Sequence, residues 1–284
     1  MFRKMFPPLH FHPVFILFIF ISILTGTFME LLIIFTIVFI HEMGHYFMAK
    51  AFKWRIRKVM LWVFGGVMET EEHGNRSIKE DVLVTIAGPI QHIFIYLLLY
   101  ILLISGILNE AIFNTAISYN TVILIFNLLP IWPLDGGKLL FILMSVKYPY
   151  RKAMDAILLI SMILSILLIV MHMFFYPFTL SFTLIMLFLF IENRLEWKRR
   201  FFIFLRFLLE RYRGNNAVGK LEVLHLPGNI SLMEAFSLFK REKKHTIAIK
   251  DQHTVHRIDE TDCLHAYFHK KQYNRQIYDI LNDS

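Results

Sequence analysis

The chain has 284 residues, of which 56% are hydrophobic and only 18% are charged, and its mean hydropathy is +0.54. These values exclude an ordinary soluble protein and indicate an integral membrane protein. The formal net charge of +8 would suit nucleic-acid binding only if the basic residues formed one soluble patch, and they are instead distributed along the chain. The single cysteine, Cys263, excludes an internal disulfide, and we expect it to be a core residue in a reducing compartment.

Apolar runs separated by polar connections predict a helical membrane protein with six transmembrane helices. The first run could be mistaken for a signal peptide, but no small-x-small cleavage site follows it and a second run begins almost at once. The predicted spans are residues 13–24, 31–52, 81–105, 117–133, 155–173 and 178–191.

The distribution of Lys and Arg predicts the orientation of these spans. All 30 Lys and Arg residues lie in segments 1–30, 50–80, 138–152 and 194–284, and the turns on the opposite side contain none. Because positive charge is retained on the cytoplasmic side, both termini are predicted to be cytoplasmic.

The second predicted span carries the sequence His41-Glu42-Met43-Gly44-His45 in its latter half. Residues four apart share one face of a helix, so His41 and His45 can offer two imidazole nitrogens to one zinc ion. Glu42 would then lie beside the metal as the general base. Ionisable groups in an apolar span are costly without a partner, and a buried metal would supply one.

A catalytic zinc needs a third protein ligand and one open position. Asp135 is the predicted third ligand, because it follows the broken end of the fourth span at the membrane level predicted for the histidines, and Gly136 and Gly137 leave its carboxylate room to reach across. Zinc would activate a water molecule for attack on a carbonyl carbon, with Glu42 accepting the proton. The predicted reaction is peptide hydrolysis.

Substrate-binding residues are predicted in two places. Phe64, Gly65 and Gly66 lie in a run with strand-type residues that is too short to span the membrane, which predicts a membrane-associated strand or β-hairpin; it could hold a substrate extended, or it could serve packing alone. Asn127 could bind the substrate backbone or the developing oxyanion, or it could satisfy backbone groups released by Pro130.

Two further histidines stay open. His73 lies in a polar loop, where a solvated role is favoured over gating, and His92 in the third span could form a helix–helix hydrogen bond or take part in metal chemistry.

The cytoplasmic part divides into a basic amphipathic linker over residues 194–220 and a small α/β domain over residues 221–284. The linker is either an interfacial helix or a stiff connection. Strands are predicted at 223–226, 245–250 and 254–258 and helices at 231–240 and 260–269, the first with a capping box of Ser231 and Glu234.

Four sequences together resemble the site-2 protease family of intramembrane zinc metalloproteases: His41 to His45, Phe64 to Gly66, Ala87-Gly88-Pro89, and Asn127 through Gly137. The sequences from Glu71 to Arg76, Leu128 to Lys138 and Phe207 to Tyr212 resemble the sporulation branch of that family in particular. The resemblance covers essentially the whole chain. It implies that His41, His45 and Asp135 bind zinc, that Glu42 is the catalytic base, and that Asn127 lies by the substrate.

The resemblance also implies that residues 221–284 are similar to one cystathionine-β-synthase (CBS) type domain. Such domains are often nucleotide sensors, so ATP is an implied ligand, and because one unit is present, pairing between chains or with another protein is expected. The implied substrate is the pro-sequence of a sporulation sigma factor, cut at the mother-cell membrane around the forespore, with inhibitory membrane proteins as further partners.

Two other functions would use the same features. A metal-ion transporter could use the two histidines and Asp135 as a transit site, and a catalytically silent receptor could sense nucleotide through residues 221–284.

Overall fold

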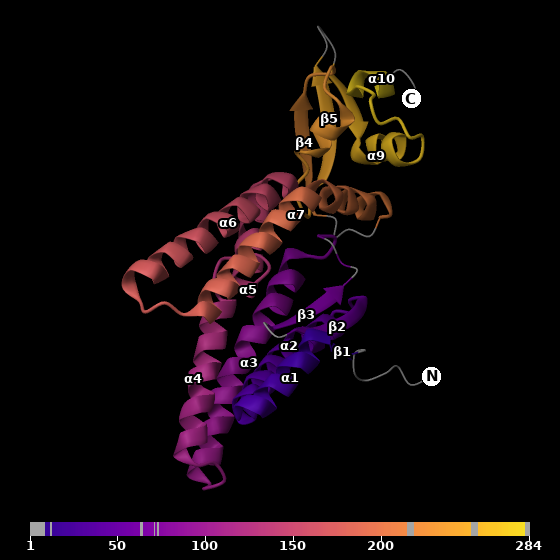
Figure 1. Ribbon diagram of the computed structural model, residues 1–284. Helices are drawn as coiled ribbons and strands as arrows, with labels where there is room; N and C mark the ends of the chain where they lie inside the picture. The colour runs from indigo at the N-terminus through magenta and orange to yellow at the C-terminus, as the bar shows by residue number, and fades with distance from the viewer. Residues whose placement is uncertain are drawn as a thin grey trace. The chain divides into compact units, whose positions relative to one another are not determined.

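The computed structural model describes residues 9–11, 13–62, 65–70, 72, 74–214, 219–250 and 255–281. The chain forms two compact units (Figure 1). The first unit comprises Met1–Glu72, Lys79–Leu139 and Ser165–Leu189, and the second comprises His73–Ile78, Leu140–Leu164 and Phe190–Ser284.

Long apolar helices dominate the chain up to position 212. Among the described residues, three of them are long and apolar enough to cross a membrane: α2 (Phe28–Ala51), α3 (Ile78–Ile104) and α6 (Tyr150–Phe175). The other predicted spans correspond to α1 (Pro13–Thr25), α4 (Glu110–Asn127) and the first part of α7 (Leu180–Tyr212).

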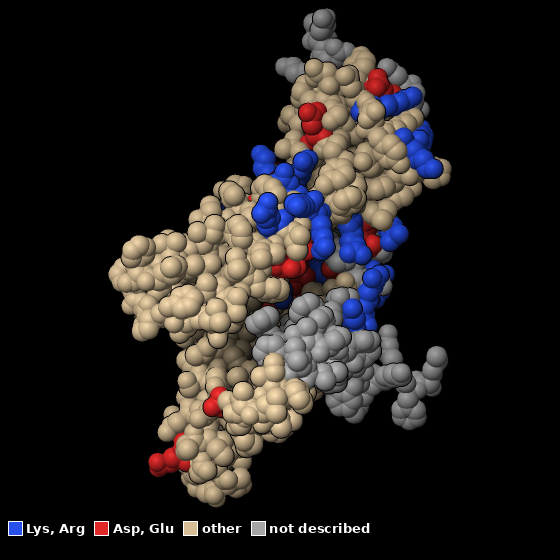
Figure 2. Space-filling model, in the orientation of Figure 1, with Lys and Arg blue, Asp and Glu red and all other residues tan. Residues whose placement is uncertain are grey.

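These helices expose large apolar side chains on their outer faces, which indicates contact with lipid. Ile104 at the end of α3 is 83% exposed and Phe174 at the end of α6 is 82% exposed. Such exposure would be costly in water but is favourable in hydrocarbon. In Figure 2 the surface over α6 is almost entirely uncharged, whereas Lys and Arg gather over the second half of α7.

A three-stranded sheet in the first unit confirms the predicted β-hairpin and adds a strand to it. The order is β1 (Leu9–Phe11), β2 (Ile56–Trp62) and β3 (Gly65–Thr70), with β1 parallel and β3 antiparallel to β2. Strand β1 was missing from the prediction, because three residues at the start of a chain carry too little pattern to be recognised.

The end of the fourth predicted span differs from the prediction. Helix α4 ends at Asn127, a short irregular segment follows, and a new helix α5 (Asp135–Lys147) begins at Asp135. The sequence predicted a connection here, because Gly136 and Gly137 disfavour a helix by propensity. Added Cβ atoms at these glycines would overlap the backbone of Leu128–Trp132, so they allow the first turn of α5 to pack against the preceding segment. This close approach requires both glycines, and room for the Asp135 carboxylate remains a prediction.

Helix α7 continues past the predicted end of the sixth span. It runs without interruption to Tyr212, because no Gly or Pro occurs between Leu180 and Tyr212. Its last turns bury Phe204, Phe207 and Leu208, and the Phe207 ring stacks on Tyr150 of α6 with centroids 4.1 Å apart. Part of the predicted linker is therefore a packed helix.

The C-terminal region is a small mixed α/β structure, as predicted. Strands β4 (Leu221–Leu226), β5 (Lys244–Lys250) and β6 (Val255–Asp259) form one sheet in that order, with β4 parallel and β6 antiparallel to β5. Helices α8 (Leu232–Phe236), α9 (Glu260–Phe268) and α10 (Ile277–Leu281) accompany it.

Two details of this region depart from the prediction. The capping box of Ser231 and Glu234 is present, but α8 ends at Phe236 and not at residue 240, because the Ser237 hydroxyl bonds the Glu234 carbonyl and a turn follows. Helix α10 was not predicted, since five residues with no strong period give no recognisable signal.

Candidate metal centre

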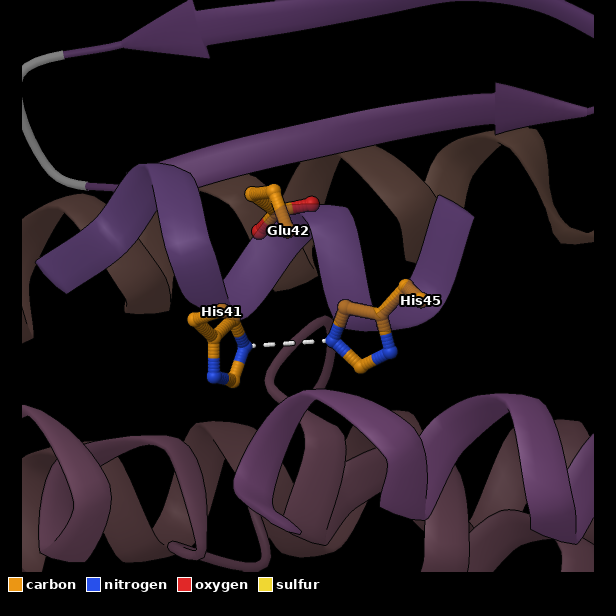
Figure 3. A group of neighbouring side chains, drawn as sticks. All are labelled: His41, Glu42 and His45. Carbon is orange, nitrogen blue, oxygen red and sulfur yellow. Dashed lines mark hydrogen bonds between the residues drawn. The ribbon is translucent and has the colours of Figure 1, made fainter. Parts of the chain in front are cut away.

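The two histidines of the motif lie on one turn of α2 and face the same way, as the spacing predicts. Figure 3 shows them on one side of α2 with their facing Nε2 atoms joined by the dashed line, which spans 3.1 Å. Glu42 lies on the side nearer the strands in the same view. All three residues are buried, and one ligand atom from each lies within 4.8 Å of the other two.

Asp135, the predicted third ligand, reaches this group from the first turn of α5, where the sequence predicted a connection. Its Oδ2 atom lies 3.1 Å from Nε2 of His41 and 3.1 Å from Nε2 of His45. The three atoms therefore form a triangle whose sides are all 3.1 Å. Tetrahedral zinc with ligands at about 2.0–2.1 Å requires ligand atoms about 3.3 Å apart, so two imidazoles and one carboxylate of this spacing fit zinc and leave a fourth position open.

The outer contacts of these ligands orient them. Nδ1 of His45 lies 2.7 Å from the backbone carbonyl of Val84 on α3, and because a carbonyl can only accept, Nδ1 carries the proton and Nε2 keeps its lone pair for a metal. The Lys138 ammonium donates to Oδ1 of Asp135 at 3.2 Å, which leaves Oδ2 directed at the histidines. Lys138 was not among the predicted site residues, and its (i, i+3) spacing from Asp135 was the available signal.

Glycines on α2 and α3 allow the two helices to approach closely at this point. A Cβ atom added to Gly88 would overlap the imidazoles of both His41 and His45, and one added to Gly44 would overlap the carbonyl of Ala87. The Ala87-Gly88-Pro89 sequence therefore forms part of the wall around the predicted metal ligands.

The three-stranded sheet packs on the neighbouring face of α2. Met43 lies inside the motif and Tyr46 directly follows it. Both pack with Phe39, Ile56 of β2 and Met68 of β3. Gly65 and Gly66 begin β3 opposite Trp62 and Leu61, while Phe64 lies outside the described residues. The sheet thus lies against the helix that carries Glu42.

Three other residues from the sequence analysis are Asn127, His92 and His73. Asn127 ends α4, is half-buried, and donates its side-chain amide to the Ile123 carbonyl at 3.0 Å, one turn back in its own helix. His92 is fully buried beside His41, with His92 Nε2 and His41 Nδ1 3.1 Å apart. His73 lies outside the described residues.

Comparison with known proteins agrees with this centre. A model of peptidase family M50 matches residues 29–109 and 106–169. Stage IV sporulation protein FB of Bacillus subtilis is 40% identical over 275 residues, which cover 96% of each chain. A zinc metalloprotease of Methanocaldococcus jannaschii is 30% identical over 165 residues, 54% of this chain and 47% of that one.

A solved structure shares the fold. The site-2 protease from Methanocaldococcus jannaschii aligns with a TM-score of 0.54 and 27% identity, covering 69% of this chain and 93% of that one. The sequence matches, the shared fold and the His41-Glu42-His45 group lead to one assignment. The chain belongs to peptidase family M50 and is a multi-pass intramembrane zinc metalloprotease of the site-2 protease type.

Proposed function

We propose that His41, His45 and Asp135 hold one zinc ion and that Glu42 is the general base for hydrolysis of a peptide bond at the membrane. The triangle of two Nε2 atoms and one Oδ2 atom, each 3.1 Å from the others, carries this assignment. Three protein ligands with an open fourth position are typical of catalytic zinc sites.

Each residue would contribute a distinct part of the reaction. Bound zinc supplies Lewis acidity and lowers the pKa of a water molecule at the open position. The Glu42 carboxylate accepts the proton of the attacking water and returns it to the leaving amine. Glu42 is only 6% exposed, and at such a buried position its charge acts more strongly than it would in bulk water.

The substrate class follows from the relatives and from the sheet. We infer a membrane-associated protein as substrate and, from the family resemblance, the pro-sequence of a sporulation sigma factor; the 40% identity to a stage IV sporulation protein supports this. Within the described residues β3 pairs only with β2, so its other edge could receive an extended segment of substrate by strand addition. Binding of substrate by Phe64 to Gly66 and by Asn127 remains a prediction, as do inhibitory membrane partners.

The topology is proposed from sequence and structure together. Three of the helices in the described part of the chain have the length and hydropathy of spans. The proposal of six spans with both termini in the cytoplasm adds α1, α4 and the first part of α7, and it is supported by the placement of all Lys and Arg in segments of one predicted side. By resemblance the membrane is that of the mother cell around the forespore.

The C-terminal region is proposed to regulate the protease, and hydrogen bonds within the second unit support this. Residues 74–78, which lead directly into α3, are bonded to the turn after α8: Arg241 donates to the Arg76 carbonyl at 3.1 Å, and Glu242 accepts from the Ile78 amide at 2.5 Å. A carboxylate at the first amide of a helix stabilises that helix end. Since α3 carries Val84, Gly88 and His92, a change in the C-terminal region could reach the metal ligands through this helix.

ATP binding and pairing of CBS-type domains remain predictions from resemblance. A titration of the purified protein with a fluorescent ATP analogue, alongside sedimentation of the detergent-solubilised chain with and without ATP, would measure both.

The test of the catalytic assignment is Glu42→Gln, assayed for zinc content and for cleavage of a membrane-associated pro-protein. We expect unchanged zinc content and a fall in cleavage of at least about 100-fold, because the amide cannot accept the proton. Glu30→Gln is the matched control, since Glu30 lies on the same helix and accepts a hydrogen bond from Tyr119 at 3.2 Å. Undiminished cleavage by Glu42→Gln would contradict the assignment, and zinc flux in vesicles without proteolysis would favour a transporter.

A further inference from the structure

The structure contains a chain of buried polar side chains behind the metal ligands. His92 on α3 and Asn120 on α4 have no exposed surface. His92 Nε2 lies 3.1 Å from His41 Nδ1, and His92 Nδ1 lies 2.7 Å from Asn120 Oδ1. The Asn120 amide nitrogen donates to the backbone carbonyl of His92 at 3.2 Å. Three helices are thereby joined by one continuous line of hydrogen bonds that ends on a metal ligand.

The directions of the hydrogen bonds that join Asn120, His92 and His41 all follow from the backbone carbonyl of His92. The His92 carbonyl can only accept, so it must face the NH2 group of Asn120 and not its oxygen. The Asn120 oxygen is then directed at His92 Nδ1 and, being an acceptor, requires a proton on that nitrogen.

The tautomer of His92 in turn fixes the tautomer of His41. With its proton on Nδ1, neutral His92 presents a lone pair at Nε2, and the neighbouring His41 Nδ1 must donate to it. His41 then keeps the lone pair of Nε2, the atom that faces His45 and Asp135. The backbone therefore fixes the tautomer of His41 in the form that can bind zinc.

We propose that Asn120 and His92 are positioning residues that hold His41 in its zinc-binding tautomer and orientation. The tautomer of His45 is fixed directly by the Val84 carbonyl, which lies 2.7 Å from His45 Nδ1. Among the described hydrogen-bond partners of His41 Nδ1 there is no backbone carbonyl. The side chains of His92 and Asn120 fix the tautomer of His41 instead. The inference rests on the proposal that His41 binds zinc.

A purely packing role for the pair is the competing explanation. Polar side chains that bond across membrane helices contribute modestly to helix association. Such a role predicts that replacement lowers stability but leaves the metal affinity of the folded protein unchanged. A positioning role predicts a change in metal affinity that depends on whether the replacement residue retains a hydrogen-bond acceptor.

The experiment measures zinc affinity by competition with a chelator, and the visible spectrum of the Co2+-substituted protein, on purified full-length chain. His92→Phe keeps a ring but removes the acceptor, and we expect zinc affinity about 10- to 100-fold lower with an altered Co2+ spectrum. His92→Gln can offer its amide oxygen to His41, so its affinity should lie closer to wild type. Asn120→Leu should weaken zinc binding, and Asn120→Asp, which keeps an acceptor, should restore most of it.

Two further measurements separate the explanations. If Asn120 acts on His41 only through His92, the double variant of His92→Phe and Asn120→Leu loses no more zinc affinity than His92→Phe alone. His172→Phe is the matched control, because His172 also lies in an apolar helix and bonds a hydroxyl, that of Thr179, at 2.7 Å. It should leave zinc affinity unchanged.

The outcomes distinguish this inference from the assignment of the ligands. Wild-type zinc affinity and Co2+ spectrum in folded His92→Phe would overturn the positioning role, even if His41→Ala abolishes zinc binding. Wild-type zinc content in His41→Ala would instead refute His41 as a ligand. If His92→Phe and Asn120→Leu fail to fold, the conservative pair decides, because weak zinc binding by both His92→Gln and Asn120→Asp would also contradict the inference.

Discussion

At the scale of single residues, each proposed ligand of the centre contacts a group that can orient it. His45 is oriented by the Val84 carbonyl, Asp135 by the Lys138 ammonium and His41 by His92. Partners of this kind fix the tautomer and direction of metal ligands, and their loss typically costs 10- to 100-fold in affinity.

Gly88→Ala tests the tight fit around the histidines. The added methyl group would overlap both imidazoles, so α3 or the ligands must shift, and we expect zinc content and cleavage to fall together. Zinc analysis of the purified protein is the measurement, and Leu83→Ala, on an exposed position of the same helix, is the control. Normal zinc content in Gly88→Ala would show that the contact is not required.

Asp135→Ala tests the third ligand. Loss of one of three ligands should lower zinc stoichiometry in the purified protein, because two imidazoles alone hold zinc weakly. The control is Asp155→Ala, which removes a carboxylate that lies 3.7 Å from Arg200 on α7. Unchanged zinc in Asp135→Ala would remove this residue from the ligand set.

At the scale of elements, three features bring the site together: the straight helix α2, the break between α4 and α5, and the sheet. Helix α2 aligns the histidines, the break starts a new helix at Asp135, and strands β2 and β3 pack beside Met43 and Tyr46. The edge of β3 that pairs with no other described strand is the proposed place for an extended substrate, since hydrolysis of a helical segment requires its backbone to be unwound first.

Disulfide crosslinking tests the role of β3. In a Cys263→Ser background, Gly66→Cys should crosslink to a substrate that carries single cysteines near its cleavage site, and the yield should alternate along the substrate as expected for a paired strand. The Glu42→Gln change would keep the substrate uncut. Lys220→Cys is the control position, and equal crosslinking at both positions would contradict strand addition.

At the scale of the whole molecule, the chain combines an apolar helical part with a small mixed α/β region that contains a buried ion pair. Arg211, at the end of α7, donates to Glu260 Oε2 at 2.8 Å, and the backbone amide of His245 donates to the same carboxylate at 2.8 Å. A buried charged group of this kind is destabilising unless it is fully paired, so helix α7 and the C-terminal sheet depend on each other.

The stability of this region should fall in acid. Burial by itself raises the pKa of Glu260, but the hydrogen bonds with His245 and the charge of Arg211 outweigh it, so the pKa lies below the ordinary value of 4.5. A carboxylate with a lowered pKa contributes stability that is complete above its unfolded pKa and is lost as pH falls through its folded pKa.

Cys263 reports this loss. The side chain is fully buried, and burial raises the pKa of its thiol to about 12, so it should react slowly in the folded protein. We expect modification by dithiodipyridine to accelerate below pH 4.5, and Glu260→Gln to show a flatter pH dependence. A pH dependence identical in wild type and Glu260→Gln would rule out this carboxylate as the cause.

Cysteine labelling tests the proposed topology. In the same Cys263→Ser background, expressed in the plasma membrane of non-sporulating cells, Ile107→Cys lies in the turn between α3 and α4 and is predicted to react with an impermeant maleimide from outside intact cells. Lys220→Cys, on the predicted cytoplasmic side, should react only after permeabilisation. The reverse pattern would overturn the orientation, because both positions depend on the same count of Lys and Arg.

The sequence by itself predicted the chemistry of the centre, because its signals are local or compositional. The spacing of His41 and His45 is a helical repeat, and the apolar runs are read from composition. The capping box of Ser231 and Glu234 and the hairpin of β2 and β3 were predicted for the same reason. Asp135 was predicted from its place after a broken helix.

The tertiary structure decided what depends on contacts between distant segments. The partnership of His92 and Asn120 with His41 joins three helices. A side chain at Gly88 would overlap the histidines only because α3 meets α2 there, and Gly136 and Gly137 accompany a helix start that their propensity disfavours. No residue in those segments carries a pattern that names its partner. A local repeat determines which groups share a face of a helix, whereas packing determines which face of another helix they meet.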